Sequence, residues 1–131
     1  PDHKIIEFAC RDGNISKYYK NFDYIGLDSC QKLLNRNINL YNSVVYKSLL
    51  YNTPFKDTYF DYSFSYDPFK NITKLEIITD ILKEMERISN HGVCILNLNI
   101  NSNTYTYHMF LKRGYNIFNI DNDYFNIYKL F

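Results

Sequence analysis

The sequence predicts an α/β fold with a mostly parallel sheet that ends in an antiparallel C-terminal hairpin. First, apolar runs at 4–9 and 24–28 enclose a turn with one glycine, which is the outline of a nucleotide-binding βαβ unit. Second, a helix-period apolar stripe over 75–88 lies between two short apolar runs. Third, alternating runs at 115–120 and 124–130 flank Asp121-Asn122-Asp123, a turn typical of a hairpin.

The composition fits a small enzyme or binding domain and excludes few functions. With 131 residues, 46% hydrophobic and 18% aromatic, residues 1–131 are expected to form a single domain. A formal net charge of +1 does not indicate a strongly basic nucleic-acid-binding protein, although a local basic patch stays open. Cys10, Cys30 and Cys94 are odd in number and lack metal-ligand spacing, which favours free thiols in a reducing compartment and no metal site. No apolar run approaches the roughly 18 residues of a membrane span, so a cytoplasmic protein is expected.

The N-terminal unit is expected to hold a ligand at the carboxyl ends of its strands. Its expected elements are a strand over 4–9, a crossover helix over 14–21 and a strand over 24–28. In such a unit the first amides of the crossover helix face the ligand, and Asp28 meets ribose hydroxyls. Ala9 and Arg11 stand in the turn where glycine is usual, which leaves only Gly13. Residues other than glycine resist the positive φ that such loops use.

The remaining elements follow from caps, breakers and periodicity. The chain is expected to continue with a helix over 29–34 capped by Ser29, a strand over 44–46, a loop holding Pro54 and Asp57, and a strand over 59–65 that Pro68 stops. A longer helix begins at Thr73, with Glu76 as its capping-box partner, and ends at His91-Gly92, where Gly92 takes the left-handed conformation. A buried strand over 93–98, a polar loop over 99–104 and a helix over 105–113 closed by Gly114 then lead to the hairpin.

Several stretches of the chain resemble a known enzyme family. The order of elements resembles the class I S-adenosylmethionine-dependent methyltransferases, whose sheet ends in a hairpin after a helix with an ending similar to Leu-Lys-Arg-Gly-Tyr at 111–115. More narrowly, four stretches resemble successive signatures of the eukaryotic tRNA wobble-uridine carboxymethyl methyltransferases: 25–34 (IGLDSCQKLL), 53–61 (TPFKDTYFD), 107–110 (YHMF) and 121–124 (DNDY). The resemblance implies a Rossmann-like class I methyltransferase fold and S-adenosylmethionine as the cofactor.

The resemblance also implies a set of cofactor-binding residues. Glu7 would lie near the amino-acid end of S-adenosylmethionine, with the loop 9–13 beneath it. Asp28 would accept hydrogen bonds from the ribose hydroxyls. The acidic residue that contacts adenine in relatives falls at Leu49, or at Ser48 in the alternative alignment, so this contact is lost. The implied cofactor-binding residues are Glu7, Ala9, Cys10, Gly13, Asp28, Ser29, Ser48 and Leu49.

The side of the site that would receive the substrate is less defined, and no catalytic residue is identified. Methyl transfer from a sulfonium to a carboxylate needs alignment rather than a general base, because the carboxylate is already a nucleophile. Lys70 or His108 could hold a carboxylate or a phosphate. Tyr66 or Tyr107 could stack on a base. The substrate-side candidates are Ser65, Lys70, Tyr107, His108 and Asn122.

Three functions stay open at this stage. The first is methylation of a carboxymethyl group on the tRNA wobble uridine, for which the resemblance implies tRNA and a small zinc-binding activator subunit as partners, the latter at the edge strand near Val44 to Tyr46. The second is a degenerate, non-catalytic scaffold or binding subunit, which Ala9, Arg11, Leu49 and Lys70-Asn71 favour, the last pair standing where the family carries two histidines. The third is a methyltransferase that acts on a small molecule or a protein. Relatives carry a longer insertion near Asn99 to Thr104, where substrate contacts could lie.

Overall fold

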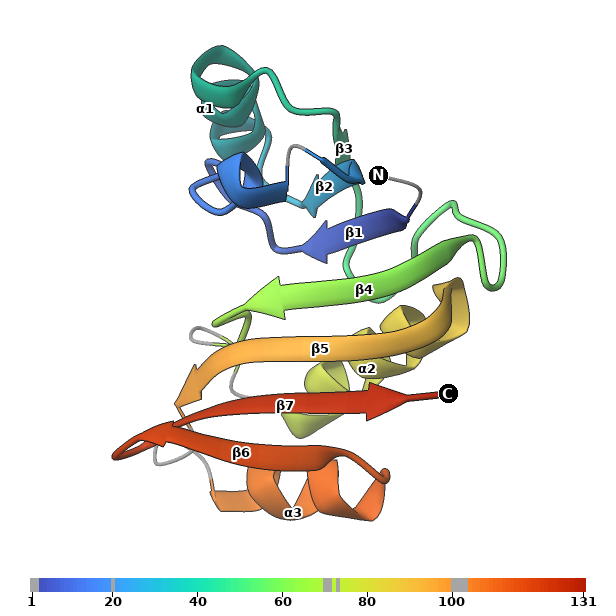
Figure 1. Cartoon of the computed structure of the whole chain (residues 1–131), viewed down its shortest axis with the longest axis vertical. Helices are drawn as coiled ribbons and strands as arrows, with labels where there is room; N and C mark the ends of the chain where they lie inside the picture. Colours follow the sequence, from blue (N-terminus) through green and yellow to red (C-terminus); the bar gives the residue numbers. More distant parts are fainter. Residues whose placement is uncertain (1–2, 20, 70–71, 73, 100–103) are drawn as a thin grey trace.

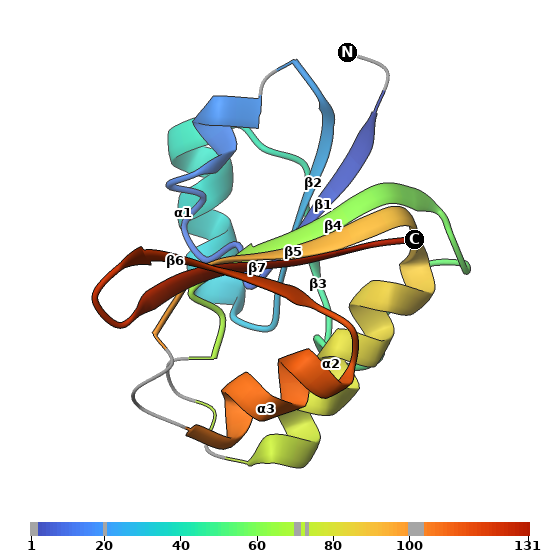
Figure 2. The same ribbon diagram turned by 60° about the horizontal axis from the view of Figure 1, so that its bottom comes forward.

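A computed structural model describes residues 3–19, 21–69, 72, 74–99 and 104–131. In these residues one seven-stranded sheet carries helices on both faces (Figures 1 and 2). The strands are β1 (Lys4–Phe8), β2 (Asp23–Asp28), β3 (Val45–Lys47), β4 (Phe60–Tyr66), β5 (Ser89–Asn99), β6 (Asn116–Asp121) and β7 (Tyr124–Leu130). The helices are the 3-10 helix η1 (Ser16–Tyr19) and the α-helices α1 (Gln31–Tyr41), α2 (Leu75–Ile88) and α3 (Thr104–Lys112). None of these helices is long and apolar enough to cross a membrane.

The strand order places the start of the chain at the centre of the sheet. The order is β3-β2-β1-β4-β5-β7-β6. Strands β1 to β5 pair in parallel, whereas β7 runs antiparallel to both β5 and β6. This confirms the predicted α/β fold with its antiparallel C-terminal hairpin. Because the chain moves outward from β1 first in one direction and then in the other, a crevice is expected at the carboxyl ends of β1 and β4.

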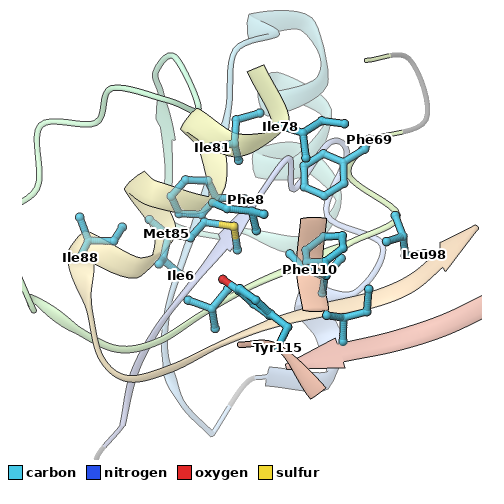
Figure 3. Close-up of a cluster of buried hydrophobic side chains, with 14 of the residues drawn as sticks. Ile6, Phe8, Phe69, Ile78, Ile81, Met85, Ile88, Leu98, Phe110 and Tyr115 are labelled. Carbon is cyan, nitrogen blue, oxygen red and sulfur yellow. The ribbon is translucent and has the colours of Figure 1, made fainter. Parts of the chain in front are cut away.

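The main core lies between the sheet and helices α2 and α3. Figure 3 shows Ile6 and Phe8 of β1 in contact range of side chains from α2, with Phe110 of α3 and Tyr115 beside them. The α2 side chains in this cluster are Ile78, Ile81, Leu82, Met85 and Ile88, each at most 2% exposed. The apolar stripe of the sequence is therefore confirmed as core. Full burial of one such side chain stabilises the fold by about 1.5–3 kcal/mol.

The connection from β1 to β2 differs from the expected helix. Its described residues, 9–19 and 21–22, contain the 3-10 helix Ser16–Tyr19 and no α-helix. The backbone groups are satisfied in tight turns: the Gly13 amide donates to the Cys10 carbonyl, and the Ser16 amide and hydroxyl both donate to the Gly13 carbonyl. The expectation that the N-terminus of an α-helix between β1 and β2 faces the ligand is therefore wrong for the described part of this connection.

Helix α1 does not begin with the predicted serine cap. Ser29 is exposed, and the N-cap residue is Cys30, which makes no side-chain cap hydrogen bond. Asp28 Oδ1 instead accepts a hydrogen bond from the Cys30 amide at 2.9 Å. An aspartate two residues upstream thus satisfies an amide at the helix start.

The start of helix α2 also lacks the predicted capping box. Thr73 lies outside the described residues, and the N-cap is Lys74, which makes no side-chain cap hydrogen bond. Because Leu75 is the first helical residue, Glu76 is the second. A capping box needs its acidic residue at the third helical position.

The end of helix α2 lies earlier than predicted, because tertiary pairing overrides the local glycine signal. The helix ends at Ile88, and residues 89–99 form β5. Gly92 does not adopt the predicted left-handed conformation, since it pairs with Tyr62 of β4 and Leu130 of β7. A side chain at Gly92 would place its Cβ 2.7 Å from the Lys129 carbonyl oxygen, so glycine is needed here for close strand approach.

The predicted end of α3 and the C-terminal turn are confirmed. Gly114 has φ +85° and its amide donates to the Leu111 carbonyl, as a glycine after a helix often does. Asn122 has φ +45° in the turn between β6 and β7, a conformation that asparagine tolerates better than most residues.

We expect Met85→Ala to lower the free energy of unfolding by about 2–5 kcal/mol, because Met85 is fully buried between α2 and the sheet. Urea unfolding, monitored by circular dichroism, measures the change in free energy. Lys83→Ala, on the exposed side of the same helix, serves as the control and should change stability by less than about 0.5 kcal/mol. Equal effects of the two substitutions would contradict this account of the core.

Candidate functional site

A cavity of about 480 Å3 opens at the carboxyl ends of β1, β4 and β5, whose arrowheads point to the left in Figure 1. Its volume lies within the range of small-molecule pockets, and its place at a reversal of strand order is where α/β sheets bind ligands. The lining residues are Glu7, Ala9, Cys10, Arg11, Asp12, Asn14, Ile15, Lys17, Tyr18, Tyr66 and Leu96.

The loop after β1 uses left-handed backbone at alternate positions. Ala9 has φ +56°, Arg11 has φ +54° and Gly13 has φ +83°. The two positions where the sequence lacks an expected glycine therefore still adopt the conformation that favours glycine. At Gly13 a glycine is also needed for space, because an added Cβ would lie 2.4 Å from Asn37 of α1.

Backbone strain gathers around this cavity. Asp67, directly after β4, has φ +46°, and Asn97 of β5 has φ +54°. With Ala9 and Arg11 they make four of the seven non-glycine residues with positive φ in the described part of the chain. Such a conformation costs roughly 1–2 kcal/mol for residues such as Ala9 and Arg11, and less for Asp67 and Asn97, because aspartate and asparagine tolerate it better. Strain of this kind concentrates at functional sites, so its position supports the cavity as the functional site.

The carboxylate of Asp28 holds the loop in place. Asp28 Oδ2 accepts a hydrogen bond from the Arg11 amide at 2.9 Å, while Oδ1 accepts the one from the Cys30 amide. The residue is 7% exposed and does not line the cavity. Each carboxylate oxygen keeps further acceptor capacity, so the ribose contact stays a prediction.

The Arg11 side chain crosses the mouth of the crevice. Its Nη2 donates to the Asp67 carbonyl oxygen at 2.8 Å. This hydrogen bond links the loop after β1 to the segment after β4, and Arg11 is one of the residues that line the cavity.

Glu7 is a buried carboxyl group that lines the cavity. It is 2% exposed, and its Oε1 accepts a hydrogen bond from the Tyr24 hydroxyl at 2.6 Å. Burial raises the pKa of Glu7 to about 7, although the Tyr24 hydrogen bond and the positive charge of Arg11 act in the opposite direction. The carboxyl is thus poised to gain or lose its proton near neutral pH. Burial also raises the pKa of the Cys10 thiol, which argues against a reactive thiolate.

The predicted adenosine-side residues lie outside the cavity, along the ends of β2 and β3. The Ser48 amide donates to the Asp28 carbonyl at 3.1 Å, which places the start of this segment beside β2. Leu49 is 51% exposed. Ser29 is exposed next to Asp28. The structure therefore brings Glu7, Ala9 and Cys10 together in the cavity, whereas Gly13, Asp28, Ser29, Ser48 and Leu49 do not line it.

None of the described substrate-side candidates lines the cavity. Ser65 is fully buried in β4, and its hydroxyl donates to the Phe8 carbonyl of β1. Tyr107 packs against the Phe125 ring of β7, and His108 is exposed next to it on α3. Asn122 lies in the turn between β6 and β7, and Lys70 lies outside the described residues.

Sequence reasoning missed the outer part of the cavity. Asn14, Ile15, Lys17 and Tyr18 line it because the connection after β1 contains a 3-10 helix, and they extend the lining beyond Asp12 of the predicted loop 9–13. Leu96 belongs to β5 and was not singled out. The only sequence signal for the 3-10 helix was the polar composition of residues 14–21, which is unfavourable for a regular crossover helix. Among the described residues no group of three or more histidine, cysteine, aspartate or glutamate side chains could hold a metal ion.

Comparison with known proteins gives a fold but no sequence family. No protein-family profile matches the sequence, and no curated protein matches it. Among solved structures, a protein of Pyrococcus horikoshii OT3 is 12% identical with a TM-score of 0.85, covering 99% of this chain and 82% of its own.

Two further structures carry an activity in their names. A SAM-dependent methyltransferase of Methanosarcina mazei is 15% identical with a TM-score of 0.71, covering 85% of this chain, which spans 60% of that protein. The magnesium protoporphyrin IX methyltransferase of Synechocystis PCC 6803, with bound SAM, is 11% identical with a TM-score of 0.70. The match covers 99% of this chain and 69% of that protein. At these identities the likeness shows the fold: the chain has the Rossmann-like α/β fold found in SAM-dependent methyltransferases.

We expect Ala9→Gly to raise the free energy of unfolding by about 0.5–1 kcal/mol. Relief of the left-handed strain exceeds the entropy that a glycine adds to the unfolded chain. Ala9→Val should destabilise, because a β-branched residue resists this conformation still more. Urea unfolding of both variants checks the order. A stabilising valine would contradict the observed backbone.

Stability should depend on pH through Glu7. Its folded pKa of about 7 lies above the ordinary 4.5, so between these values the folded chain keeps a proton that the unfolded chain has lost. The free energy of unfolding therefore falls as pH rises through this range, by about 3 kcal/mol in total. Glu7→Gln should remove this decline between about pH 5 and pH 8, while Glu76→Gln on the exposed face of α2 should preserve it. Parallel slopes for wild type and Glu7→Gln would exclude this role.

Proposed function

We propose that this chain is an S-adenosylmethionine-dependent methyltransferase. The observation that carries the proposal is the cavity at the carboxyl ends of β1, β4 and β5, which contains a buried carboxyl group and a left-handed loop. Solved structures with the same fold include SAM-dependent methyltransferases, one with SAM bound.

The residues of the cavity fit this cofactor. S-adenosylmethionine supplies a methyl group on a positively charged sulfonium, and its amino-acid end carries an ammonium. Glu7, ionised in the presence of such charges, would hold the ammonium in a buried setting where charge pairing is strong. Asp28 at the end of β2 would take the ribose hydroxyls, and Ser48 and Leu49 would lie beside the adenine. Left-handed backbone at Ala9 lets the loop approach the ligand closely.

We further propose that the acceptor is a carboxymethyl group on the tRNA wobble uridine. The support is the resemblance of residues 25–34, 53–61, 107–110 and 121–124 to that family. The cavity also carries Lys17, Tyr18 and Tyr66, whose exposed side chains suit a phosphate and a base. Among the described residues, the lining contains no histidine that could act as a general base. A carboxylate nucleophile does not need such a base.

A zinc-binding activator subunit would dock at β3, the edge strand of the sheet. Val44 and Tyr46 are 58% and 45% exposed there. Exposed apolar side chains on an unpaired edge are a liability unless a partner covers them. This supports a protein partner at β3 as part of the proposal.

Calorimetric titration with S-adenosylmethionine and S-adenosylhomocysteine tests the cofactor proposal. Wild type should bind with micromolar affinity, about −8 kcal/mol. Glu7→Gln should weaken binding about tenfold or more, because the ammonium loses its charged partner. Glu76→Gln should bind like wild type. No binding up to millimolar ligand by a folded chain, alone and with the activator subunit, would reject the enzyme and favour a non-catalytic scaffold.

The acceptor is tested separately. With the activator subunit present, transfer of a labelled methyl group to tRNA that carries carboxymethyluridine is expected, and tRNA with an unmodified wobble uridine is the control. Cofactor binding together with transfer to neither tRNA would reject the tRNA proposal and favour a small molecule or protein as acceptor.

A further inference from the structure

We propose that Arg11 selects the ligand of the cavity by binding the carboxylate of an amino-acid group whose ammonium is held by Glu7. The inference rests on the proposed function and adds a binding residue that stands where the loop conformation suits glycine.

The backbone at Arg11 is strained. Its φ of +54° costs roughly 1–2 kcal/mol that a glycine would avoid. The amide of Arg11 is fixed by Asp28 Oδ2 at 2.9 Å, so the strained backbone is held in one place. The Arg11 backbone from which the side chain starts is thus held at the cavity that the residue lines. A costly conformation that is kept for a cationic residue of a pocket points to a role for that cation.

The guanidinium of Arg11 has unused hydrogen-bonding capacity. An arginine carries five N–H donors in a planar fork that matches a carboxylate. In the structure Nη2 donates to the Asp67 carbonyl, and the described residues offer the guanidinium no further hydrogen-bond acceptor. This contact anchors the group across the crevice and leaves donors for a ligand carboxylate.

The cavity lining carries opposite charges at Glu7 and Arg11. The positive charge of Arg11 acts to lower the pKa of Glu7. An amino-acid group carries its ammonium and carboxylate on one carbon, which complements a carboxylate and a guanidinium from residues that line one cavity. The other cation of the lining, Lys17, lies over the Tyr18 ring at 5.2 Å, and Asp12 lies 4.0 Å from Arg36. Arg11 is therefore the cation best placed for the carboxylate.

Two ligands that differ only in the amino-acid group test this role. S-adenosylhomocysteine carries the group, whereas 5′-methylthioadenosine keeps the nucleoside and the thioether without it. Calorimetric titration is done with wild type, Arg11→Gln and Arg11→Lys. Arg11→Gln removes the charge but keeps a long polar side chain. Arg11→Lys keeps the charge but lacks the planar guanidinium that can bind a carboxylate through two hydrogen bonds. Lys32→Gln, on the exposed face of α1, is the matched control for loss of a positive charge.

Wild type should bind S-adenosylhomocysteine at least about tenfold more tightly than 5′-methylthioadenosine. Arg11→Gln should weaken S-adenosylhomocysteine about 10- to 100-fold and leave 5′-methylthioadenosine unchanged, because a charge-assisted pair is lost from one ligand only. Arg11→Lys should recover part of the loss, and Lys32→Gln should match wild type. Thermal unfolding confirms that each variant is folded.

Two results would overturn the role of Arg11 while the cofactor proposal survives. One is tighter or unchanged binding of S-adenosylhomocysteine by Arg11→Gln, which would mean that Arg11 obstructs the cavity or does not reach the ligand. The other is an equal loss for both ligands, which would mean that Arg11 only shapes the loop. A folded wild type that binds neither ligand would overturn the cofactor proposal and this inference together.

Discussion

The two hydrogen bonds to the Asp28 carboxylate are the constraint on which the candidate site depends. One fixes the amide of Arg11 in the loop after β1, and the other fixes the amide of Cys30 at the start of α1. Because Asp28 ends β2, which pairs in parallel with β1, a single side chain connects the loop after β1, the end of β2 and the start of α1 at the carboxyl ends of these strands. The loop after β1 can keep its left-handed backbone conformation because these hydrogen bonds offset the strain.

The loop also depends on what lies beneath it. Asn37 of α1 is fully buried and reaches so close to Gly13 that no side chain fits there. Its Nδ2 donates to the Cys10 sulfur at 3.7 Å. Position 13 therefore requires glycine for space as well as for backbone conformation. At Ala9 and Arg11 the neighbouring space admits a side chain, so only conformational strain opposes the substitutions.

The sequence predicted the parts of the fold that local patterns encode, and missed those that distant strands decide. The apolar period of α2, the turn at Asn122 and the ending of α3 at Gly114 are local signals and proved correct. The Gly92 signal failed because pairing with β4 and β7 outweighed it. At the site, the sequence identified Glu7 and the unusual Ala9 and Arg11. It could not place Tyr66 or Leu96 in the same cavity, because only the order of strands brings them there.

Arg11 first counts against a working cofactor site, because a long side chain occupies a position that glycine usually holds open. The structure changes the weight of that argument. Strain alone would select glycine, and an arginine that merely filled space would be an expensive choice. Here the side chain crosses to the Asp67 carbonyl and lies on the same cavity as the buried carboxyl of Glu7. A buried acid and an anchored cation on one cavity complement a zwitterion better than a purely cationic ligand, so the departure from glycine is consistent with a specialised site rather than a lost one.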